Sequence, residues 1–337
     1  MRRPALLISA GEALFASFFS RQQQERLNRS FRWERFETRR LTADFKKQIG
    51  LADALITTWD SPHFDDSLLE MAPRLRVIAH CGGEVKSRFG RSLFTRLTIT
   101  NAQDSMARAT AELGATLLLY CARNVDFYRE ALRKQSNRIY GDVHLHGGSR
   151  SESLIGQTVA MVGFGRIARA LVDLLRGFSV NWLVHDPYVS QSWSKKYPVK
   201  FVSLHNLLPK AHLLVLTAAL TDQTRGLLGK ENLARLPDGA ALINIARGGL
   251  IDLPALRVEV QQGRLRCALD VTDPMEPLPV GDELRTRQGA IITPHIAGSG
   301  GHVREDIARV VLDDLNSFFR GKAVKNRVTE AMLARMK

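Results

Sequence analysis

One short stretch of the chain carries a glycine spacing that is typical of phosphate binding. In MVGFGRIARA, the residues Gly163, Gly165 and Ala168 form a G-x-G-x-x-A pattern. The first glycine permits a tight turn, the second lets the backbone approach a phosphate, and the small third residue lets a helix pack on a strand. The expected helix begins with Arg166 and Ile167, whose N–H groups would face a pyrophosphate. The stretch therefore predicts a dinucleotide site.

An acidic residue follows at the distance that such a site requires. Asp186 ends the run NWLVHD, and 186 − 165 = 21 residues separate it from Gly165. A carboxylate there accepts hydrogen bonds from the adenosine ribose and repels a 2′-phosphate. Pro187 and Tyr188 come next, with no arginine beside the acid. The pattern favours NAD over NADP as the cofactor.

Two further side chains have types that suit anion binding and proton transfer. Arg247 lies in INIARGGLID, between Ala246 and two glycines, and its planar guanidinium matches a carboxylate bidentately. His295 lies in TPHIAGSGG, and an imidazole exchanges protons near neutral pH. The alternatives are a salt bridge at a helix cap for the arginine and a structural role for the histidine.

These residues need a scaffold that brings distant loops together. Seven short apolar runs in the second half are predicted strands: TVAMVGF, NWLVHD, VKFVS, HLLVLTA, AALINIA, RCALDV and AIITPH. Four more, ALLISA, DALITTW, LRVIAHC and LTITNA, alternate with helical patterns in the first 100 residues. A long helical tract runs from Asp104 to about Arg133, and another begins near Gly300. The alternation predicts parallel sheets covered by helices.

Together, the glycine turn, INIARGGLID, LDVTDPMEPLP and TPHIAGSGG resemble the D-isomer-specific 2-hydroxyacid dehydrogenase family over nearly the whole chain. The resemblance implies an α/β fold of two doubly wound parallel-sheet domains. These are a Rossmann NAD-binding domain over 111–301 and a flavodoxin-like substrate domain over 1–110 plus 302–337. It further implies an NAD-dependent oxidoreductase that interconverts a small 2-keto acid and its D-2-hydroxy acid by hydride transfer. Glyoxylate, hydroxypyruvate and 3-phosphoglycerate are the substrates that it suggests.

The resemblance also assigns the catalytic set. Arg247 is expected to bind the substrate carboxylate, and His295 to exchange the proton. The family pairs this histidine with a glutamate, for which Glu276 is the candidate; yet 276 − 270 = 6 residues separate it from Asp270, where the family has five, because Met275 stands as an extra residue. Either the loop absorbs it and Glu276 reaches the histidine, or the pair is impaired and Asp273 is the fallback.

The remaining contacts that the resemblance implies lie on both sides of the expected site. Those to the cofactor are Thr217, Ala246, Asp270 and Gly298, with Asp270 near the nicotinamide and Thr217 near a ribose. In the first domain, IAHCGGEVK matches the substrate loop, and the N–H groups of Gly82, Gly83 and Glu84 are expected to hold a carboxylate. Glu84 replaces a usual glycine, so a tight turn with an exposed acid is the alternative.

Composition limits the partners and the compartment. The chain has 48 Lys and Arg against 34 Asp and Glu, a net charge of +14, but the basic residues are scattered, so nucleic acid is not a favoured partner. No run approaches the roughly 18 apolar residues of a membrane helix. Cys81, Cys121 and Cys267 lack metal-ligand spacing, which predicts no metal site and a reducing cytoplasm. The irregular segment 135–153 suggests the arm of a homodimer, which is usual in the family.

A second class of function stays open at this point. An NADH-responsive, co-repressor-like scaffold with little catalysis would share the dinucleotide turn. Such a scaffold need not retain Arg247, Glu276 and His295 together, whereas an enzyme must.

Overall fold

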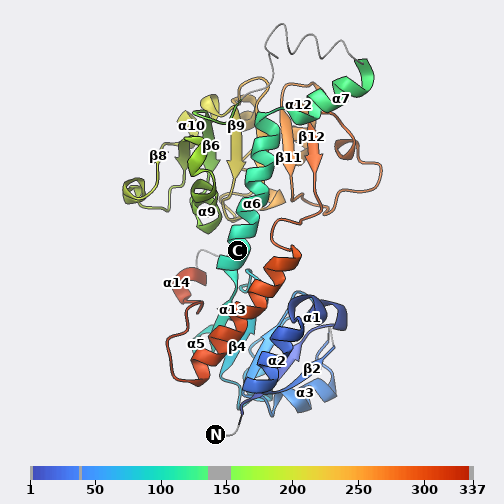
Figure 1. Ribbon diagram of the computed structural model, residues 1–337, viewed down its shortest axis with the longest axis vertical. Helices are drawn as coiled ribbons and strands as arrows, with labels where there is room; N and C mark the ends of the chain where they lie inside the picture. Colours follow the sequence, from blue (N-terminus) through green and yellow to red (C-terminus); the bar gives the residue numbers. More distant parts are fainter. Residues whose placement is uncertain (1–2, 38–39, 136–152, 334–337) are drawn as a thin grey trace. The chain divides into compact units, whose positions relative to one another are not determined.

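The computed structural model describes residues 3–37, 40–135 and 153–333 (Figure 1). They form two compact units: unit 1 comprises residues 1–106 and 299–337, and unit 2 comprises residues 107–298. These junctions lie within a few residues of the predicted domain boundaries. Most of the segment predicted to be a dimer arm, 135–153, lies outside the described residues.

Unit 1 contains a parallel sheet of five strands in the order β2-β1-β3-β4-β5. The strands are β1 (Ala5–Ser9), β2 (Arg32–Phe36), β3 (Ala54–Thr57), β4 (Val77–His80) and β5 (Thr98–Asn101). The helices are α1 (Glu12–Phe18), α2 (Arg21–Ser30), α3 (Ala43–Ile49), α4 (Leu68–Met71), α5 (Leu93–Arg96), α13 (Gly301–Phe319) and α14 (Glu330–Leu333). The predicted strands are all present, but β2 was not foreseen, because RWERF is an edge strand rich in charge.

Period-two alternation along the strands of unit 1 fills a core on each face of the sheet. Leu6 and Ile8 of β1 pack in the cluster that includes residues of α1, α2 and α13. Leu7, between them, packs in the cluster that includes residues of α3, α4 and α5. The sheet is therefore doubly wound, as predicted, and the final long helix α13 belongs to this unit.

Unit 2 contains a parallel sheet of seven strands in the order β12-β11-β10-β9-β6-β7-β8. The strands are β6 (Thr158–Val162), β7 (Asn181–His185), β8 (Val199–Phe201), β9 (Leu213–Leu216), β10 (Ala241–Asn244), β11 (Arg266–Leu269) and β12 (Ala290–Ile292). The α-helices are α6 (Gln103–Ala122, which begins in unit 1), α7 (Val125–Gln135), α9 (Arg166–Leu174), α10 (Leu204–Leu207), α11 (Lys230–Ala234) and α12 (Leu253–Gln261). Short 3-10 helices are η1 (Arg176–Phe178), η2 (Gln191–Lys195), η3 (Leu208–Lys210), η4 (Gly248–Leu250) and η5 (Glu283–Arg285).

The strand order of unit 2 reverses between β6 and β9. From β6 the chain builds outward through β7 and β8, and it then returns to β9 on the other side of β6. In open parallel sheets, ligands bind outside the carboxyl ends of the strands at such a switch point. Because all the strands are parallel, the loops that carry Gly163, Thr217, Arg247, Asp270 and His295 emerge at this one edge.

The helical tract predicted from Asp104 to Arg133 is interrupted. α6 ends at Ala122, Asn124 adopts a left-handed φ of 50°, and α7 begins at Val125. Asparagine tolerates this conformation better than most residues, so the break is local to it. Among the described residues, no helix combines the length and apolar character needed to cross a membrane.

Candidate active site

The glycine turn connects β6 to α9, and its first glycine is sterically required. Gly163 has a φ of +92°, and a Cβ atom there would lie 2.5 Å from the backbone nitrogen of Ala218. Its N–H donates to the carbonyl oxygen of His185 at 2.8 Å. The turn is thus pressed against the loop that follows β9, and a side chain at position 163 would push the two apart.

The second glycine has the opposite surroundings. Gly165 is the N-cap of α9, and a Cβ atom built on it meets no atom within 4 Å. Arg166 and Ile167 form the first turn of the helix, while Ala168 is fully buried in the core beneath. Open space directly above a helix N-terminus fits a pyrophosphate, since N–H groups and the helix dipole both favour an anion there.

Asp186 lies beside this turn, as its spacing predicted. One carboxylate oxygen accepts from the Phe164 N–H at 2.7 Å, and the other accepts from the Tyr188 N–H at 2.9 Å. The half-buried carboxylate is therefore fixed at the rim of the glycine turn. Each oxygen retains a second lone pair, with which a ribose hydroxyl can be bound.

Thr217 ties the glycine turn to β9. Its buried hydroxyl lies 2.9 Å from the carbonyl oxygen of Gly163 and 3.2 Å from that of Val162. A hydroxyl has one proton to donate, and here the carbonyl oxygens of the glycine turn accept it. The predicted contact of Thr217 with a ribose stays a prediction. In the structure, Thr217 holds the glycine turn against the end of β9.

The loop after β10 presents Arg247 on a clamped backbone. The side chain of Asn244 donates to the carbonyl oxygen of Arg247 at 2.9 Å and accepts from the Ala246 N–H at 3.0 Å. A Cβ atom at Gly248 would lie 2.2 Å from the backbone of Thr272, so this loop abuts the one after β11. The Arg247 side chain is exposed, with one N–H bonded to the Ala246 carbonyl at 2.7 Å.

His295 and Glu276 meet across two loops. Nδ1 of His295 contacts one carboxylate oxygen of Glu276, and the other oxygen accepts from the Thr272 N–H at 3.1 Å. Both side chains keep access to solvent, with 47% of the histidine and 32% of the glutamate exposed. Because Nδ1–H donates to the carboxylate, Nε2 is the ring nitrogen left for exchange with a substrate.

The loop after β11 absorbs its extra residue. The Thr272 hydroxyl donates to the carbonyl oxygen of Met275 at 2.6 Å, and the Met275 side chain points outward, 56% exposed. Glu276 therefore reaches His295 despite the longer spacing. Asp273, the fallback partner, instead forms an ion pair with Arg225 at 3.1 Å.

Asp270 has a task that sequence reasoning did not foresee. Its carboxylate is fully buried and accepts from the Thr293 hydroxyl at 2.6 Å and from the N–H groups of Ile296 and Ala297 at 2.9 and 3.0 Å. Its carbonyl oxygen also accepts from the His295 N–H at 2.9 Å. Asp270 thus holds the turn in which His295 adopts a φ of 54°. The sequence signal that could have indicated this role is an acidic residue directly after a buried strand.

The predicted substrate loop of unit 1 follows β4. The Gly82 N–H donates to the carbonyl oxygen of His80 at 2.9 Å, so the predicted anion nest loses one of its three donors. Asn101 and Gln103 hold the Gly83 carbonyl at 2.8 and 3.0 Å. The Glu84 carboxylate accepts from the N–H and the hydroxyl of Ser87. Glu84 therefore closes a turn, which was the alternative interpretation of this acid.

A neutral histidine lies beneath this loop. Burial lowers the pKa of His80 to about 3, and the nearby charge of Arg88 acts in the same direction. Nδ1 of its ring lies 2.9 Å from the Thr57 hydroxyl. A Cβ atom at Gly82 would be 2.4 Å from its Nε2, so the ring fixes how closely the loop approaches the sheet. A histidine at the end of an apolar run was not recognised as part of this site.

Comparison with known families agrees with this geometry. The model of the D-isomer-specific 2-hydroxyacid dehydrogenase NAD-binding domain matches residues 115–297, more than half of the chain. The chain belongs to this family. It is an NAD-dependent D-2-hydroxyacid dehydrogenase, and the predictions of family, fold class, enzyme class and cofactor are confirmed. The scaffold alternative is not favoured.

Individual relatives match most of the dehydrogenase's length. A glyoxylate reductase of Korarchaeum cryptofilum is 28% identical over 83% of the chain and 84% of the relative. A D-3-phosphoglycerate dehydrogenase of Methanocaldococcus jannaschii is 28% identical over 77% of the chain, but only 49% of that longer relative. Among solved structures, a phosphoglycerate oxidoreductase from Rhizobium etli has a TM-score of 0.81 and 25% identity, covering 97% of the chain and 99% of that protein.

Proposed function

We propose that Arg247, Glu276 and His295 are the catalytic residues of this dehydrogenase. The observation that carries the proposal is the contact between His295 and Glu276, held in place by the buried Asp270. In reduction, Nε2 of the protonated histidine donates to the developing alkoxide; in oxidation, the neutral ring takes the hydroxyl proton. Glu276 orients the ring through its contact with Nδ1.

The substrate carboxylate is assigned to Arg247. The guanidinium is exposed at the carboxyl end of β10, and the clamp by Asn244 fixes the backbone from which it extends. A planar fork of N–H donors binds a carboxylate in two parallel hydrogen bonds and so sets the orientation of the keto acid. From unit 1, the N–H groups of Gly83 and Glu84 are proposed to contribute, since among the described residues neither donates to a backbone acceptor.

The cofactor is proposed to lie along the edge from β7 to β12. When bound, NADH supplies the hydride. Gly163, Gly165, Arg166 and Ile167 would hold its pyrophosphate, and Asp186 its adenosine ribose. Thr217, Ala246, Asp270 and Gly298 are the proposed residues on the nicotinamide side, where Asp270 acts through the loop that it anchors.

Glyoxylate or hydroxypyruvate is the proposed keto acid, and 3-phosphoglycerate is the alternative substrate, a hydroxy acid that the enzyme would oxidise. Relatives named glyoxylate reductase support glyoxylate, and they match the chain over more of their own length than the phosphoglycerate dehydrogenases do. The small 2-keto acid would then be reduced to the corresponding 2-hydroxy acid, which has the D configuration where carbon 2 is a stereocentre.

The deciding experiment is a panel of keto acids assayed by loss of NADH absorbance. Glyoxylate, hydroxypyruvate, pyruvate and 3-phosphohydroxypyruvate are compared with NADH and with NADPH, using wild type and His295→Asn in parallel. We expect turnover with NADH on at least one small acid and its near loss in the variant. A panel without turnover, with NADH still bound, would contradict the proposed catalytic role.

We also propose that the enzyme works as a homodimer in the cytoplasm. Dimers are usual in the family that the sequence resembles, and the three cysteines are buried free thiols, as a reducing compartment requires. Sedimentation equilibrium at micromolar concentration measures the mass directly. A species of 37.7 kDa would be the monomer and would contradict the dimer.

A further inference from the structure

A basic cavity lies in unit 1, where the carboxyl ends of α2 and α13 meet. It has a volume of about 460 Å³. Four cations line it, Arg26 and Arg29 from α2 and Arg320 and Lys322 from the end of α13, against the single carboxylate of Asp313. None of these residues has a part in the candidate active site.

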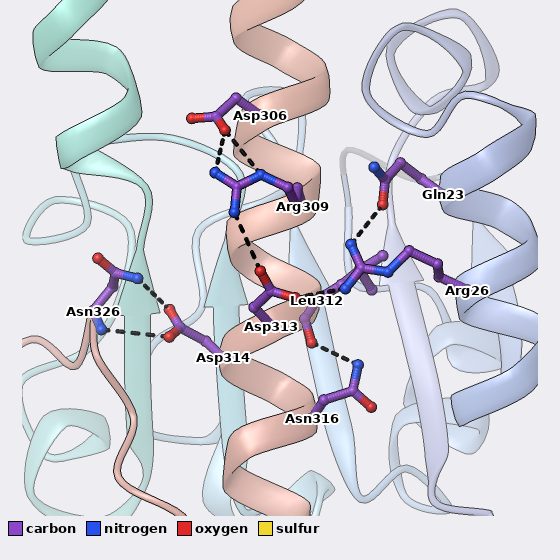
Figure 2. A network of polar contacts seen from close by, with 9 residues as sticks. All are labelled: Gln23, Arg26, Asp306, Arg309, Leu312, Asp313, Asp314, Asn316 and Asn326. Atoms are coloured by element: carbon purple, nitrogen blue, oxygen red, sulfur yellow. Dashed lines mark hydrogen bonds and ion pairs between the residues drawn. The ribbon is translucent and has the colours of Figure 1, made fainter.

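The one carboxylate is already neutralised by its neighbours. Figure 2 shows Asp313 on α13 between two guanidiniums. Arg26 reaches it from α2 at 2.5 Å, and Arg309 reaches it from the preceding turn of α13 at 3.3 Å. A second N–H of Arg26 donates to the side-chain oxygen of Gln23 at 3.1 Å. Asp313 therefore positions Arg26 at the cavity and has little charge left to repel an anion.

Arg320 and Lys322 are held in place by backbone, and their side chains are not needed to cap the helix. Gly321 has a φ of +65°, and its N–H donates to the Phe318 carbonyl at 3.0 Å. The Lys322 N–H donates to the Ser317 carbonyl at 2.9 Å, so the last turn of α13 is closed by main-chain groups. Within the described part of the chain, neither side chain forms an ion pair with a carboxylate.

The charges at the cavity add up to an excess that suits one dianion. Four cations and one carboxylate give +3. The two helix carboxyl ends contribute about −0.5 each, which leaves about +2. We propose that this cavity is a binding site for a small dianion of the phosphate monoester class, held by Arg29, Arg320 and Lys322. Arginine forks match phosphate oxygens, and the concave shape with this volume fits a small molecule rather than an extended polymer.

The proposed site is at the far edge of the sheet from the substrate loop. Arg76, the residue before β4, stacks over the ring of Phe319 at 4.9 Å, so α13 ends at the amino edge of the sheet. The loop with Gly82 follows the carboxyl end of the same strand. Four residues of strand span about 13 Å. A bound dianion therefore leaves the substrate loop free, and the site is separate from the proposed function.

The test uses phenyl phosphate as the probe, titrated calorimetrically into the full chain with saturating NADH present to fill the glycine turn. The variant is Arg320→Ala with Lys322→Ala. The matched control is Lys46→Ala with Lys47→Ala, which removes the same charge from exposed positions of α3 in the same unit. We expect single-site binding in wild type and control, and at least ten-fold weaker binding in the variant, since each lost charged hydrogen bond costs about that factor.

Three outcomes would overturn the proposal. The first is no binding by the wild type, and the second is equal weakening in the variant and the control, which would mean unspecific attraction by net charge. The third is tighter binding of a twelve-residue oligothymidylate than of phenyl phosphate, with the same loss in the variant, which would mean a nucleic-acid surface. Arg29 is 79% exposed, and within the described residues its one ion pair is with Glu25 at 3.8 Å. Arg29→Ala therefore serves as a second variant and should also weaken the binding of phenyl phosphate.

Discussion

At the residue scale, the two oxygens of Glu276 have different tasks. One contacts Nδ1 of His295, and the other accepts from the Thr272 N–H. The second bond fixes the carboxylate, and the fixed carboxylate then fixes the ring. A glutamine has a single acceptor oxygen, so if it kept the Thr272 bond it would lose both the charge beside the imidazole and the acceptor for Nδ1–H.

Substitution at the histidine gives the first prediction. His295→Asn should lower turnover by about 10²–10⁴-fold, because it removes the proton donor while the anchored turn remains. NADH affinity, measured by quenching of tryptophan fluorescence, should change by less than about three-fold. Glu276→Gln should lower turnover less than His295→Asn does. Wild-type turnover in His295→Asn would remove the residue from the acid–base role.

Arg247 gives the second prediction. Arg247→Lys keeps the positive charge but loses the fork, so kcat/KM for the keto acid should fall about 10- to 100-fold, as expected when one charge-assisted hydrogen bond is lost. The exposed Arg285→Lys is the control and should be unchanged. Equal kinetics in both variants would mean that the carboxylate is bound elsewhere.

At the scale of elements, the loop from β6 to α9 separates two uses of glycine. Gly163 lies against the backbone of Ala218, whereas Gly165 faces open space. The G-x-G-x-x-A pattern had already assigned the tight turn to the first glycine and the approach to a phosphate to the second. The structure gives this difference its physical form, since the first glycine is packed against a neighbouring loop and the second leaves room for a ligand.

That difference gives a paired prediction. Gly163→Ala should destabilise the protein by at least about 1–3 kcal/mol, because alanine is strained at φ +92° and collides with the adjacent loop. Gly165→Ala should leave stability within about 0.5 kcal/mol of wild type but weaken NADH binding, since its methyl group fills the space proposed for the pyrophosphate. Urea unfolding and NADH titration distinguish the two; Gly177→Ala, also in open space, is the control for both. Unaltered NADH affinity in Gly165→Ala would place the pyrophosphate elsewhere.

The elements also show where sequence reasoning succeeds and fails. Buried parallel strands are continuous apolar runs, so the seven strands of unit 2 were recognisable from their composition. The edge strand β2 was missed, because its side chains are half-exposed and charged. Arg247, Glu276 and His295, the proposed catalytic residues, were selected by type and motif. The anchors Asn244 and His80 were not. Asn244 bonds only to main-chain groups two and three residues away, which no side-chain pattern marks, and the partner of His80, Thr57, is 23 residues away and is brought to it only by folding.

At the scale of the whole molecule, acid stability should depend on one buried side chain. Native His80 has a pKa near 3, against 6.5 for an ordinary histidine, because burial disfavours its charged form. Between those values the unfolded chain binds a proton that the native protein does not. The free energy of unfolding therefore falls as the pH is lowered from about 6.5, by about 1.4 kcal/mol per pH unit from this group.

The corresponding prediction compares slopes and not absolute stabilities. Urea unfolding at each pH gives the slope of the free energy of unfolding against pH. Between pH 6 and pH 4, this slope should be smaller in His80→Gln than in wild type by about 1.4 kcal/mol per pH unit. His205→Gln, at an exposed position, should keep the wild-type slope. An unchanged slope in His80→Gln would mean that other groups govern the acid sensitivity.

The anchoring of the His295 turn has a consequence for enzyme engineering. Asp270 holds the turn through main-chain N–H groups, including that of Ile296, so any residue except proline at position 296 can keep these hydrogen bonds. Ile296 is itself 46% exposed and directly follows His295, the residue proposed to exchange the proton. A saturation library at this one codon should thus alter which substrates are accepted while the acid–base chemistry is retained.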